Sequence, residues 1–215
     1  MTPRGRRRHL AGQRSGGVFG KAAGELFTIP QHKGKSNFLD PTKINRRTRQ
    51  EWGRQRPGGG ADKVPSRKVD PNDPHLPPKD RELLDAIAKA RLNNKDDNPR
   101  VNYDAVRYID RNGDERILVT RSQGMHSERM GINYLLDDGV PDHQIKDLIT
   151  ERAPCVKNPS CERWLAVNTS STSPPTVGHI VDYQGGTNLN NNRQATSDVK
   201  GWVDSVFAPN SSWRI

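Results

Sequence analysis

The sequence predicts an α/β domain in three layers, with helices covering a mixed sheet, behind a basic and disordered N-terminal tail. Short strand-like runs alternate with amphipathic helical runs over residues 79–215. Residues 1–78 show no periodic apolar face. The charge divides at the same place, because residues 1–79 hold 18 Lys and Arg against 6 Asp and Glu, whereas residues 80–215 hold 17 against 19.

The composition of the whole chain supports this division. Hydrophobic residues make up 31% of the sequence, which is low for a chain that is packed throughout its length. We interpret residues 1–78, rich in Arg, Gly and Pro, as a disordered tail or linker, and residues 79–215 as the folded domain. We expect that residues 1–70 can be removed without unfolding it. The arginines of the tail could hold phosphates, or the tail could be only a solubilising segment or the remnant of a longer architecture.

The first half of the domain is predicted as a helix followed by a hairpin. The helix covers residues 80–92 and begins at a capping residue, Asp80. The polar run at residues 93–99 ends it. Asn112-Gly113 then forms a two-residue hairpin turn. This turn joins two strands, residues 101–109 and residues 116–120.

A second helix is predicted over residues 127–138. Gly139 ends it in a left-handed conformation, and Pro141 prevents its continuation. Gly131 inside the helix costs about 1 kcal/mol relative to alanine, which close packing of the helix on the sheet would offset. Two short elements follow, a helical turn over residues 142–148 and a strand over residues 148–152.

The last part of the chain is predicted as helix, strand and helix. Asn158 caps the first of these helices and Pro159 occupies its first position. The remaining expected elements are a helical body over residues 160–167, a loop over 170–175, a strand over 176–183, a polar loop over 185–192 and a terminal helix over 195–207.

One stretch of the sequence indicates a chemical function. His126, Cys155 and Cys161 supply three ligands, the number that a catalytic zinc ion takes from protein while one position stays open for water. Cys161 falls in the first turn of its helix, where exposed N–H groups favour a thiolate. Glu128 lies two residues after His126 and can transfer protons without binding the metal.

Other interpretations of these residues stay open. His143 could be a fourth ligand, which would make a closed, structural zinc site. Cys155 and Cys161 could form a disulfide in an exported protein or be small core residues. His126 could be an ordinary surface histidine, and Glu128 an acid favoured by the first turn of a helix. Packing is the better interpretation of several other residues, His179, Tyr103, Tyr108 and Trp164.

The order and separation of two motifs carry a family resemblance. His-Ser-Glu at residues 126–128 is followed by Thr-Glu-Arg-Ala-Pro-Cys at residues 150–155 and by a second cysteine, Cys161. The chain resembles the cytidine deaminase-like superfamily, most closely its bacterial polymorphic-toxin branch, over residues 79–207. It departs from the family pattern in one respect, since five residues separate the cysteines instead of two.

This resemblance implies the fold and the chemistry of the site. It implies a cytidine deaminase-like fold, with the two metal-bearing helices side by side on the sheet. It also implies bound Zn²⁺ held by His126, Cys155 and Cys161, with Glu128 as the proton-transferring catalytic residue. The implied activity is hydrolytic deamination of a nucleobase, cytosine ahead of adenine.

The resemblance and the basic tail favour nucleic acid as substrate, either single- or double-stranded DNA or RNA. An immunity protein that covers the pocket is an expected partner of a toxin domain. A free-nucleoside deaminase and a non-catalytic, zinc-stabilised nucleic-acid-binding module are the alternatives. No secretory signal or transmembrane run is visible, so we expect a protein of the cytoplasm, or one delivered into a target cell, without a membrane partner.

Overall fold

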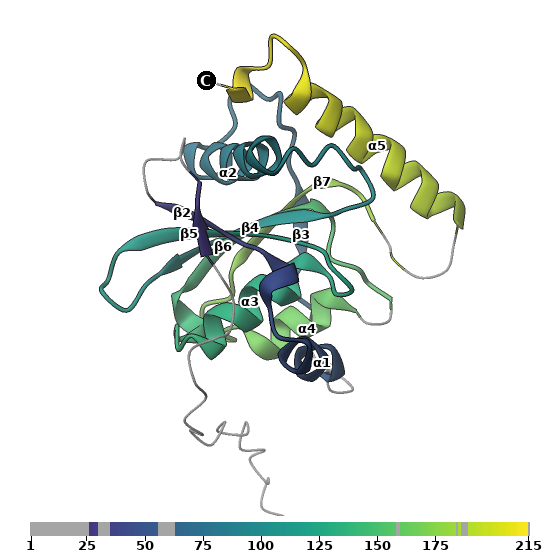
Figure 1. Cartoon of the computed structure of the whole chain (residues 1–215). Helices are drawn as coiled ribbons and strands as arrows, with labels where there is room; N and C mark the ends of the chain where they lie inside the picture. The colour runs from purple at the N-terminus through teal and green to yellow at the C-terminus, as the bar shows by residue number, and fades with distance from the viewer. Residues whose placement is uncertain are drawn as a thin grey trace, which may run out of the picture.

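The chain folds into three layers around one seven-stranded mixed sheet (Figure 1). This computed structural model describes residues 26–29, 35–55, 63–157, 160–183, 185 and 189–214. The predicted α/β class is confirmed. The strands are β1 (Leu26–Thr28), β2 (Ser36–Leu39), β3 (Ser66–Lys68), β4 (Tyr103–Ile109), β5 (Glu115–Arg121), β6 (Ile145–Arg152) and β7 (Thr176–Val181).

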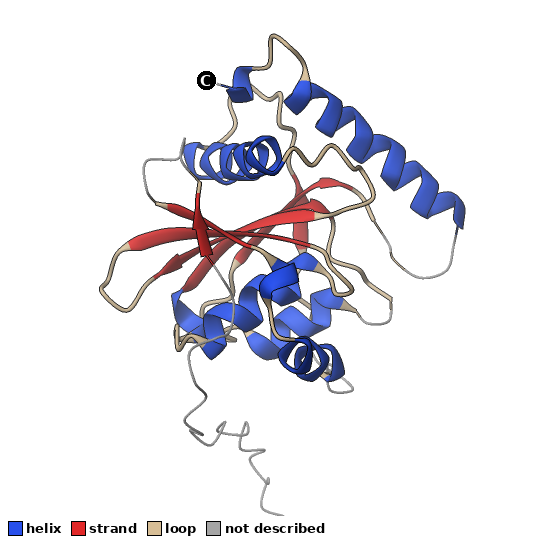
Figure 2. Ribbon diagram, viewed as in Figure 1, coloured by secondary structure: helices blue, strands red, loops and turns tan. Residues whose placement is uncertain are grey.

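Helices cover both faces of the sheet (Figure 2). They are α1 (Arg46–Arg54), α2 (Pro78–Asn94), α3 (Ser127–Asp137), α4 (Cys161–Asn168) and α5 (Leu189–Phe207), with 3₁₀ turns η1 (Pro41–Lys43), η2 (Asp142–Gln144) and η3 (Ser212–Arg214). α2 and α5 lie over one face, and α1, α3 and α4 lie over the other. Among these described helices, none combines the length and the apolar composition needed to cross a membrane.

The sheet has the order β1-β2-β5-β4-β6-β7-β3. β4 pairs antiparallel with both β5 and β6, whereas β6 and β7 run parallel and are joined through α4. Parallel neighbours end at the same edge of a sheet. The residues that follow β6 and β7 are therefore brought together at one edge, next to the start of α4.

Each face of the sheet carries its own hydrophobic core, because side chains of a strand alternate between faces. In β4, Tyr103 and Ala105 join the core under α2 and α5, whereas Val106 and Tyr108 join the core over α3 and α4. Trp164 is also fully buried in the second core. The prediction that these aromatic residues pack in the interior is confirmed.

The prediction of a disordered tail is wrong for much of residues 26–78. Strands β1, β2 and β3 and helix α1 all lie within this segment, and Phe38 and Trp52 are buried. β2 pairs with β5, and β3 pairs with β7. Removal of residues 1–70 would delete three strands of the sheet, so the structure contradicts that expectation as well. Residues 1–25 lie outside the described part of the chain.

Several element boundaries also differ from the prediction. α2 begins at Pro78, and Asp80 is a buried first-turn residue that accepts a hydrogen bond from Arg67 Nη2 at 2.5 Å instead of capping the helix. β6 begins at Ile145, which reduces the expected helical turn over residues 142–148 to η2. α5 begins six residues before the expected position, at Leu189. The helix-ending Gly139 has φ +85°, as the sequence predicts. Gly113 also has φ +85°, but the hairpin turn lies one residue earlier than predicted, because the Gly113 N–H bonds to Asp110 O and makes Arg111 and Asn112 the central residues.

A buried ion pair joins four elements of the fold. The Glu151 carboxylate accepts hydrogen bonds from Arg91 Nε at 2.6 Å and Nη2 at 2.7 Å, from the backbone N–H of Tyr103 at 2.8 Å, and from Trp202 Nε1 at 2.9 Å. Arg91 and Glu151 are both fully buried. These groups come from α2, β4, β6 and α5. The pair therefore fixes the positions of these four elements relative to one another, next to the residue that ends β6.

We predict that Glu151→Ala destabilises the protein by about 3–5 kcal/mol, because it leaves the buried guanidinium of Arg91 without its charge partner. Urea unfolding followed by circular dichroism measures the loss. Asp204→Ala is the matched control, since it breaks an exposed pair with Lys200 one helical turn away, worth about 0.3–0.5 kcal/mol. Equal effects of the two substitutions would contradict the role of the buried pair.

Candidate metal centre

The structure brings together the three predicted ligands from two separate parts of the chain. His126 lies directly before α3, Cys155 follows β6, and Cys161 is the first residue of α4. His126 Nδ1 lies 3.2 Å from Cys161 Sγ and 3.6 Å from Cys155 Sγ, and the two sulfur atoms are 3.4 Å apart. The helices α3 and α4 pack beside each other on the sheet, which places these side chains in one cluster.

This donor set fits a metal ion. Bonds of about 2.1 Å to nitrogen and 2.3 Å to sulfur place the ligand atoms of a tetrahedral zinc site roughly 3.5–3.8 Å apart, close to the observed separations. The cysteines are free thiols, and their sulfur atoms are much further apart than the roughly 2.05 Å of a disulfide. The open sulfur–sulfur distance argues against the disulfide interpretation.

The pKa values of the clustered groups also favour binding of a cation. A hydrogen bond from Cys161 and another from His126 lower the pKa of Cys155 to about 5, whereas bonding to Cys155 and burial raise the pKa of Cys161. Without a metal ion, only one of the two adjacent thiols is therefore ionised. Bonding to Cys155 and Glu128 raises the pKa of His126 to about 10, so a bound divalent ion replaces protons on both the imidazole and Cys161.

Glu128 lies beside the cluster, in the first turn of α3. One of its carboxylate oxygens, Oε1, is 3.7 Å from His126 Nδ1, and the side chain is 2% exposed. Burial by itself would raise the pKa of Glu128, but the hydrogen bond and the positive charge of His126 outweigh it and hold this pKa below its usual value. The carboxyl group is thus ionised and can accept a proton.

Close contacts on the sheet hold the start of α3. A Cβ atom added to Gly131 would lie 3.2 Å from Thr120 Cγ2 and 3.5 Å from Asp104 Oδ2, which confirms the predicted close packing at this glycine. The Thr120 hydroxyl bonds both to the Asp104 carboxyl group and to the backbone carbonyl of Ser127. Burial raises the pKa of Asp104 well above its usual value, which favours the neutral carboxyl group beneath the start of α3.

Asn102 connects the elements that carry the site. Its Nδ2 donates to Ser127 Oγ at 2.9 Å and to Thr150 Oγ1 at 2.8 Å, and its Oδ1 accepts from the backbone N–H of Arg152 at 2.8 Å. Ser127 Oγ in turn lies 3.5 Å from Glu128 Oε2. Asn102 therefore positions the start of α3 against the end of β6, with both of its amide protons already used.

Gly185 lets the backbone at that position lie close to the cluster. Gly185 has φ +72°, and a Cβ atom there would lie 2.7 Å from Cys155 Cβ. A side chain at this position would displace the cysteine. Cys161 is fixed from the other side, since its backbone N–H donates to Cys155 Sγ at 3.3 Å. This bond confirms the predicted first-turn position of Cys161. The predicted cap is wrong, because α4 begins at Cys161 with Ser160 as its N-cap, whereas the expected cap Asn158 and first residue Pro159 lie outside the described residues.

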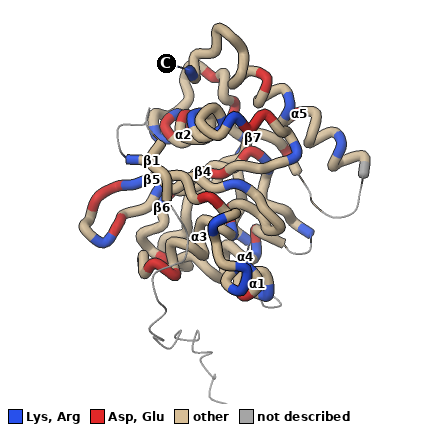
Figure 3. Tube along the Cα trace, in the orientation of Figure 1, with Lys and Arg blue, Asp and Glu red and all other residues tan. Residues whose placement is uncertain are grey.

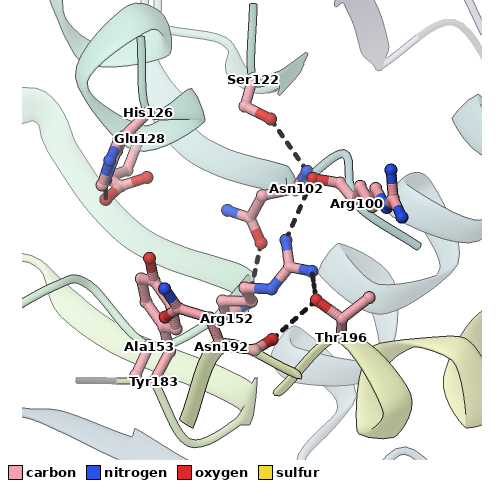
Figure 4. A pocket seen from close by; sticks show the side chains of 10 residues that line it. All are labelled: Arg100, Asn102, Ser122, His126, Glu128, Arg152, Ala153, Tyr183, Asn192 and Thr196. Carbon is pink, nitrogen blue, oxygen red and sulfur yellow. Dashed lines mark hydrogen bonds and ion pairs between the residues drawn. The ribbon is translucent and has the colours of Figure 1, made fainter. Parts of the chain in front are cut away.

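A cavity of about 290 Å³ opens in front of His126 and Glu128 (Figure 4). This volume is near the lower end of the roughly 300–1,000 Å³ of small-molecule sites. Side chains from the ends of several elements line it, namely Arg100, Asn102, Ser122, His126, Glu128, Arg152, Ala153, Tyr183, Asn192 and Thr196. In Figure 4, His126 and Glu128 stand on one side, and Arg152 and Thr196 stand on the other.

Sequence reasoning found the cluster and Glu128 but not the rest of this cavity. The sequence pattern gives Arg152 a place in the motif but no role, and it predicts Tyr183 only as the end of a strand. The signal that could have found both is the parallel pairing of β6 and β7, since residues that follow parallel strands meet at one edge. Asn192 and Thr196 come from the first turns of α5, whose early start the sequence did not reveal.

The two other histidines considered for the site lie elsewhere. The side chain of His143 is 61% exposed and lies 3.6 Å from Asp142 Oδ1, and it is not in the described metal-ligand group. This position argues against His143 as a fourth ligand. His179 is buried in β7, where its ring bonds to Ser66 Oγ at 2.9 Å and to Asp182 Oδ1 at 3.0 Å, which confirms its interpretation as a packed residue.

Comparison with protein families places the site in a known context. Residues 100–198 match the family model described as Xanthomonas-like deaminase, and this segment contains the three clustered ligands and Glu128. The segment is a deaminase domain of the cytidine deaminase-like superfamily. Comparison of the chain with curated proteins and with solved structures gave no match.

We predict that the deaminase domain binds one zinc ion per chain and that Cys155→Ala abolishes this binding, because two remaining protein ligands hold zinc poorly. Metal analysis of protein purified with zinc measures the occupancy. His143→Ala serves as the control and should retain the ion, since its side chain lies apart from the cluster. Full occupancy in the Cys155→Ala protein would show that the ligand assignment is wrong.

Proposed function

We propose that the chain catalyses the zinc-dependent hydrolytic deamination of a nucleobase in nucleic acid, cytosine ahead of adenine. One observation carries this proposal. The buried, ionised carboxylate of Glu128 stands next to the His126–Cys155–Cys161 cluster, at the wall of a cavity in a deaminase domain. A proton-transferring acid beside a three-ligand metal site is the arrangement that hydrolytic deamination requires.

The reaction consumes water, releases the exocyclic amine as ammonia and leaves a carbonyl oxygen on the base. When bound, zinc acidifies water and acts as a Lewis acid. Glu128 would accept the proton that the attacking water loses and pass it to the ring nitrogen. It would then take the proton of the newly added hydroxyl group, as the carbonyl forms, and pass it to the departing amine. Its burial excludes bulk water from these transfers, and the bonds through Ser127 and Asn102 hold its helix in place.

The shape of the cavity suits a single base. Tyr183 is the one aromatic side chain among the described lining residues, and it offers a flat apolar face on which a base can stack. Gly185 behind it allows the backbone to approach Cys155. A nucleobase in a strand reaches such a cavity only when it leaves the base stack, which favours single-stranded or locally opened nucleic acid as the substrate.

A basic helix beside the site supports a polymeric substrate. α1 carries four arginines and one glutamate, and Arg46, Arg47 and Arg54 are exposed (Figure 3). A Cβ atom on Gly53, near its carboxyl end, would lie 3.8 Å from Met125 Cε, and Met125 immediately precedes His126. Arginines can neutralise backbone phosphates without reading sequence, so α1 gives a strand a binding surface beyond the cavity.

The proposal includes a toxin-type role, in which the chain acts in the cytoplasm of a target cell after delivery. This role rests on the resemblance of the two motifs to the polymorphic-toxin branch. An immunity protein that covers the cavity is the corresponding partner. Co-expression of the active chain with and without such a partner, scored as viability of the host cells, tests this role separately from the chemistry.

We predict that Glu128→Gln retains zinc and the fold but lowers the deamination rate by about 10²–10⁴-fold, the usual loss when positioned acid–base catalysis is removed. The assay supplies single-stranded DNA, double-stranded DNA, RNA and free nucleosides, and mass spectrometry of the nucleosides detects uracil- and hypoxanthine-containing products. Zinc content and melting temperature are measured on the same protein. Product from free nucleosides alone would instead support a nucleoside deaminase.

Glu162→Gln is the matched control, because Glu162 is also a first-turn glutamate next to a clustered residue but pairs with Lys63 at 3.6 Å. We expect near wild-type activity from it. Near wild-type deamination by Glu128→Gln would contradict the mechanism, and loss of zinc from it would mean that Glu128 is a ligand. Absence of product from the wild type on every substrate would favour a non-catalytic zinc module.

We predict that Arg46→Gln and Arg54→Gln, made together, weaken binding of a single-stranded oligonucleotide. The slope of log affinity against log salt should fall by about 0.7 for each phosphate that the variant no longer neutralises. Fluorescence anisotropy over a salt series measures both quantities. A paired control, Lys79→Gln with Lys200→Gln, removes two exposed charges from α2 and α5 on the opposite face of the sheet. An equal effect of the two pairs would mean that α1 has no specific role.

A further inference from the structure

Arg152, which is half-buried, differs in its partners from two fully buried arginines of the domain, Arg91 and Arg107. Arg91 pairs with Glu151, and Arg107 pairs with three carboxylates, those of Glu82, Glu115 and Asp147. For Arg152, no carboxylate of the described residues lies within ion-pair distance. Its guanidinium donates from Nη2 to Pro99 O at 2.5 Å and Thr196 Oγ1 at 3.4 Å, and from Nη1 to Arg100 O at 3.4 Å.

A guanidinium in this position is a costly arrangement. Burial lowers the pKa of Arg152, which reflects the loss of solvation by its charged form, although arginine stays protonated at any physiological pH. Neutral carbonyl and hydroxyl oxygens satisfy some of its protons but leave its charge uncompensated. Arg152 is half-buried and lines the cavity, so an anion of a ligand in that cavity can reach its guanidinium and compensate the charge.

The location of Arg152 identifies the kind of anion. The side chain lines the same cavity as Glu128 and stands across it in Figure 4. Arg100, which is exposed and also lines the cavity, adds a second guanidinium at its rim. Two guanidinium groups with a nearby hydroxyl on Thr196 suit a phosphate, whose oxygens accept forked hydrogen bonds from arginine.

We propose that Arg152, assisted by Arg100, binds a phosphate of the target nucleotide while the base of that nucleotide lies against Glu128. The site then selects a phosphorylated nucleotide unit, within a strand or as a monophosphate, over a free nucleoside. This inference rests on the proposed function for the placement of the base. Because the hydrogen bonds of Arg152 with Pro99 and Thr196 are compatible with a structural role alone, the test must separate the two roles.

The test uses zinc-loaded Glu128→Gln protein, in which ligands bind with little turnover. Isothermal titration calorimetry compares cytidine with cytidine 5′-monophosphate and cytidine 3′-monophosphate, and the three adenosine counterparts are run in parallel. We expect at least one monophosphate to bind about tenfold more tightly than its nucleoside. Adding Arg152→Gln should reduce this ratio to near one, with the affinity for the nucleoside unchanged.

Two further variants make the result decisive. Arg100→Gln should lower the ratio partially, and it tests the proposal even if Arg152→Gln does not fold, because the Arg100 side chain is exposed at the rim of the cavity. Arg163→Gln changes an exposed arginine of α4 outside the cavity and should leave the ratio unchanged. Equal affinity for nucleosides and monophosphates would overturn the proposal, as would an equal loss of both in Arg152→Gln.

The outcomes also separate this inference from the proposed function. A phosphate preference that depends on Arg152, in a protein whose wild type forms no deaminated product, would sustain the phosphate site and overturn the deaminase activity. Deamination of free nucleosides as fast as of nucleotides would sustain the activity and overturn the phosphate site.

Discussion

The structure of the site depends on the crowding of two thiols, an imidazole and a carboxylate, whose nearest polar atoms lie 3.2–3.7 Å apart. His126, Cys155 and Cys161 place three donor atoms 3.2–3.6 Å apart, with Glu128 directly alongside. Without a metal ion, bonding to Cys155 and burial raise the pKa of Cys161, and bonding to Cys155 and Glu128 raises the pKa of the His126 imidazole. A bound divalent cation would let both thiols ionise, so the cluster is suited to hold a metal ion, and in the proposed function Glu128 stays free for proton transfer.

The rest of the fold holds these groups at fixed positions. The parallel pair of β6 and β7, joined through α4, sets the two cysteines at one edge of the sheet. Asn102 ties the end of β6 to the start of α3, and the buried pair of Glu151 with Arg91 fixes that strand against the helices behind it. The site therefore rests on packed strands and helices, so its geometry is preorganised.

Local patterns were sufficient to predict the elements that place the metal cluster, because amphipathic helices, the Asn112-Gly113 turn signal and Gly139 act over short distances along the chain. The strands of the N-terminal segment could not be predicted in this way. β2 and β3 have only four and three residues, and each is stabilised by pairing with a distant strand. α1 buries little besides Trp52 among its arginines, so its sequence resembles a solvated basic tail. The walls of the cavity were missed because they combine loop residues whose proximity depends on strand order.

X-ray absorption at the zinc edge of the purified, zinc-loaded chain tests the central claim most directly, because it counts the ligand atoms around the ion. The arrangement of His126, Cys155 and Cys161 predicts two sulfur atoms at about 2.3 Å, one imidazole nitrogen at about 2.0–2.1 Å, and one further light atom from solvent. A shell with two imidazoles, or one completed by a protein carboxylate, would mean that the site is closed, and would contradict the assignment of a catalytic centre with Glu128 as its proton-transferring group.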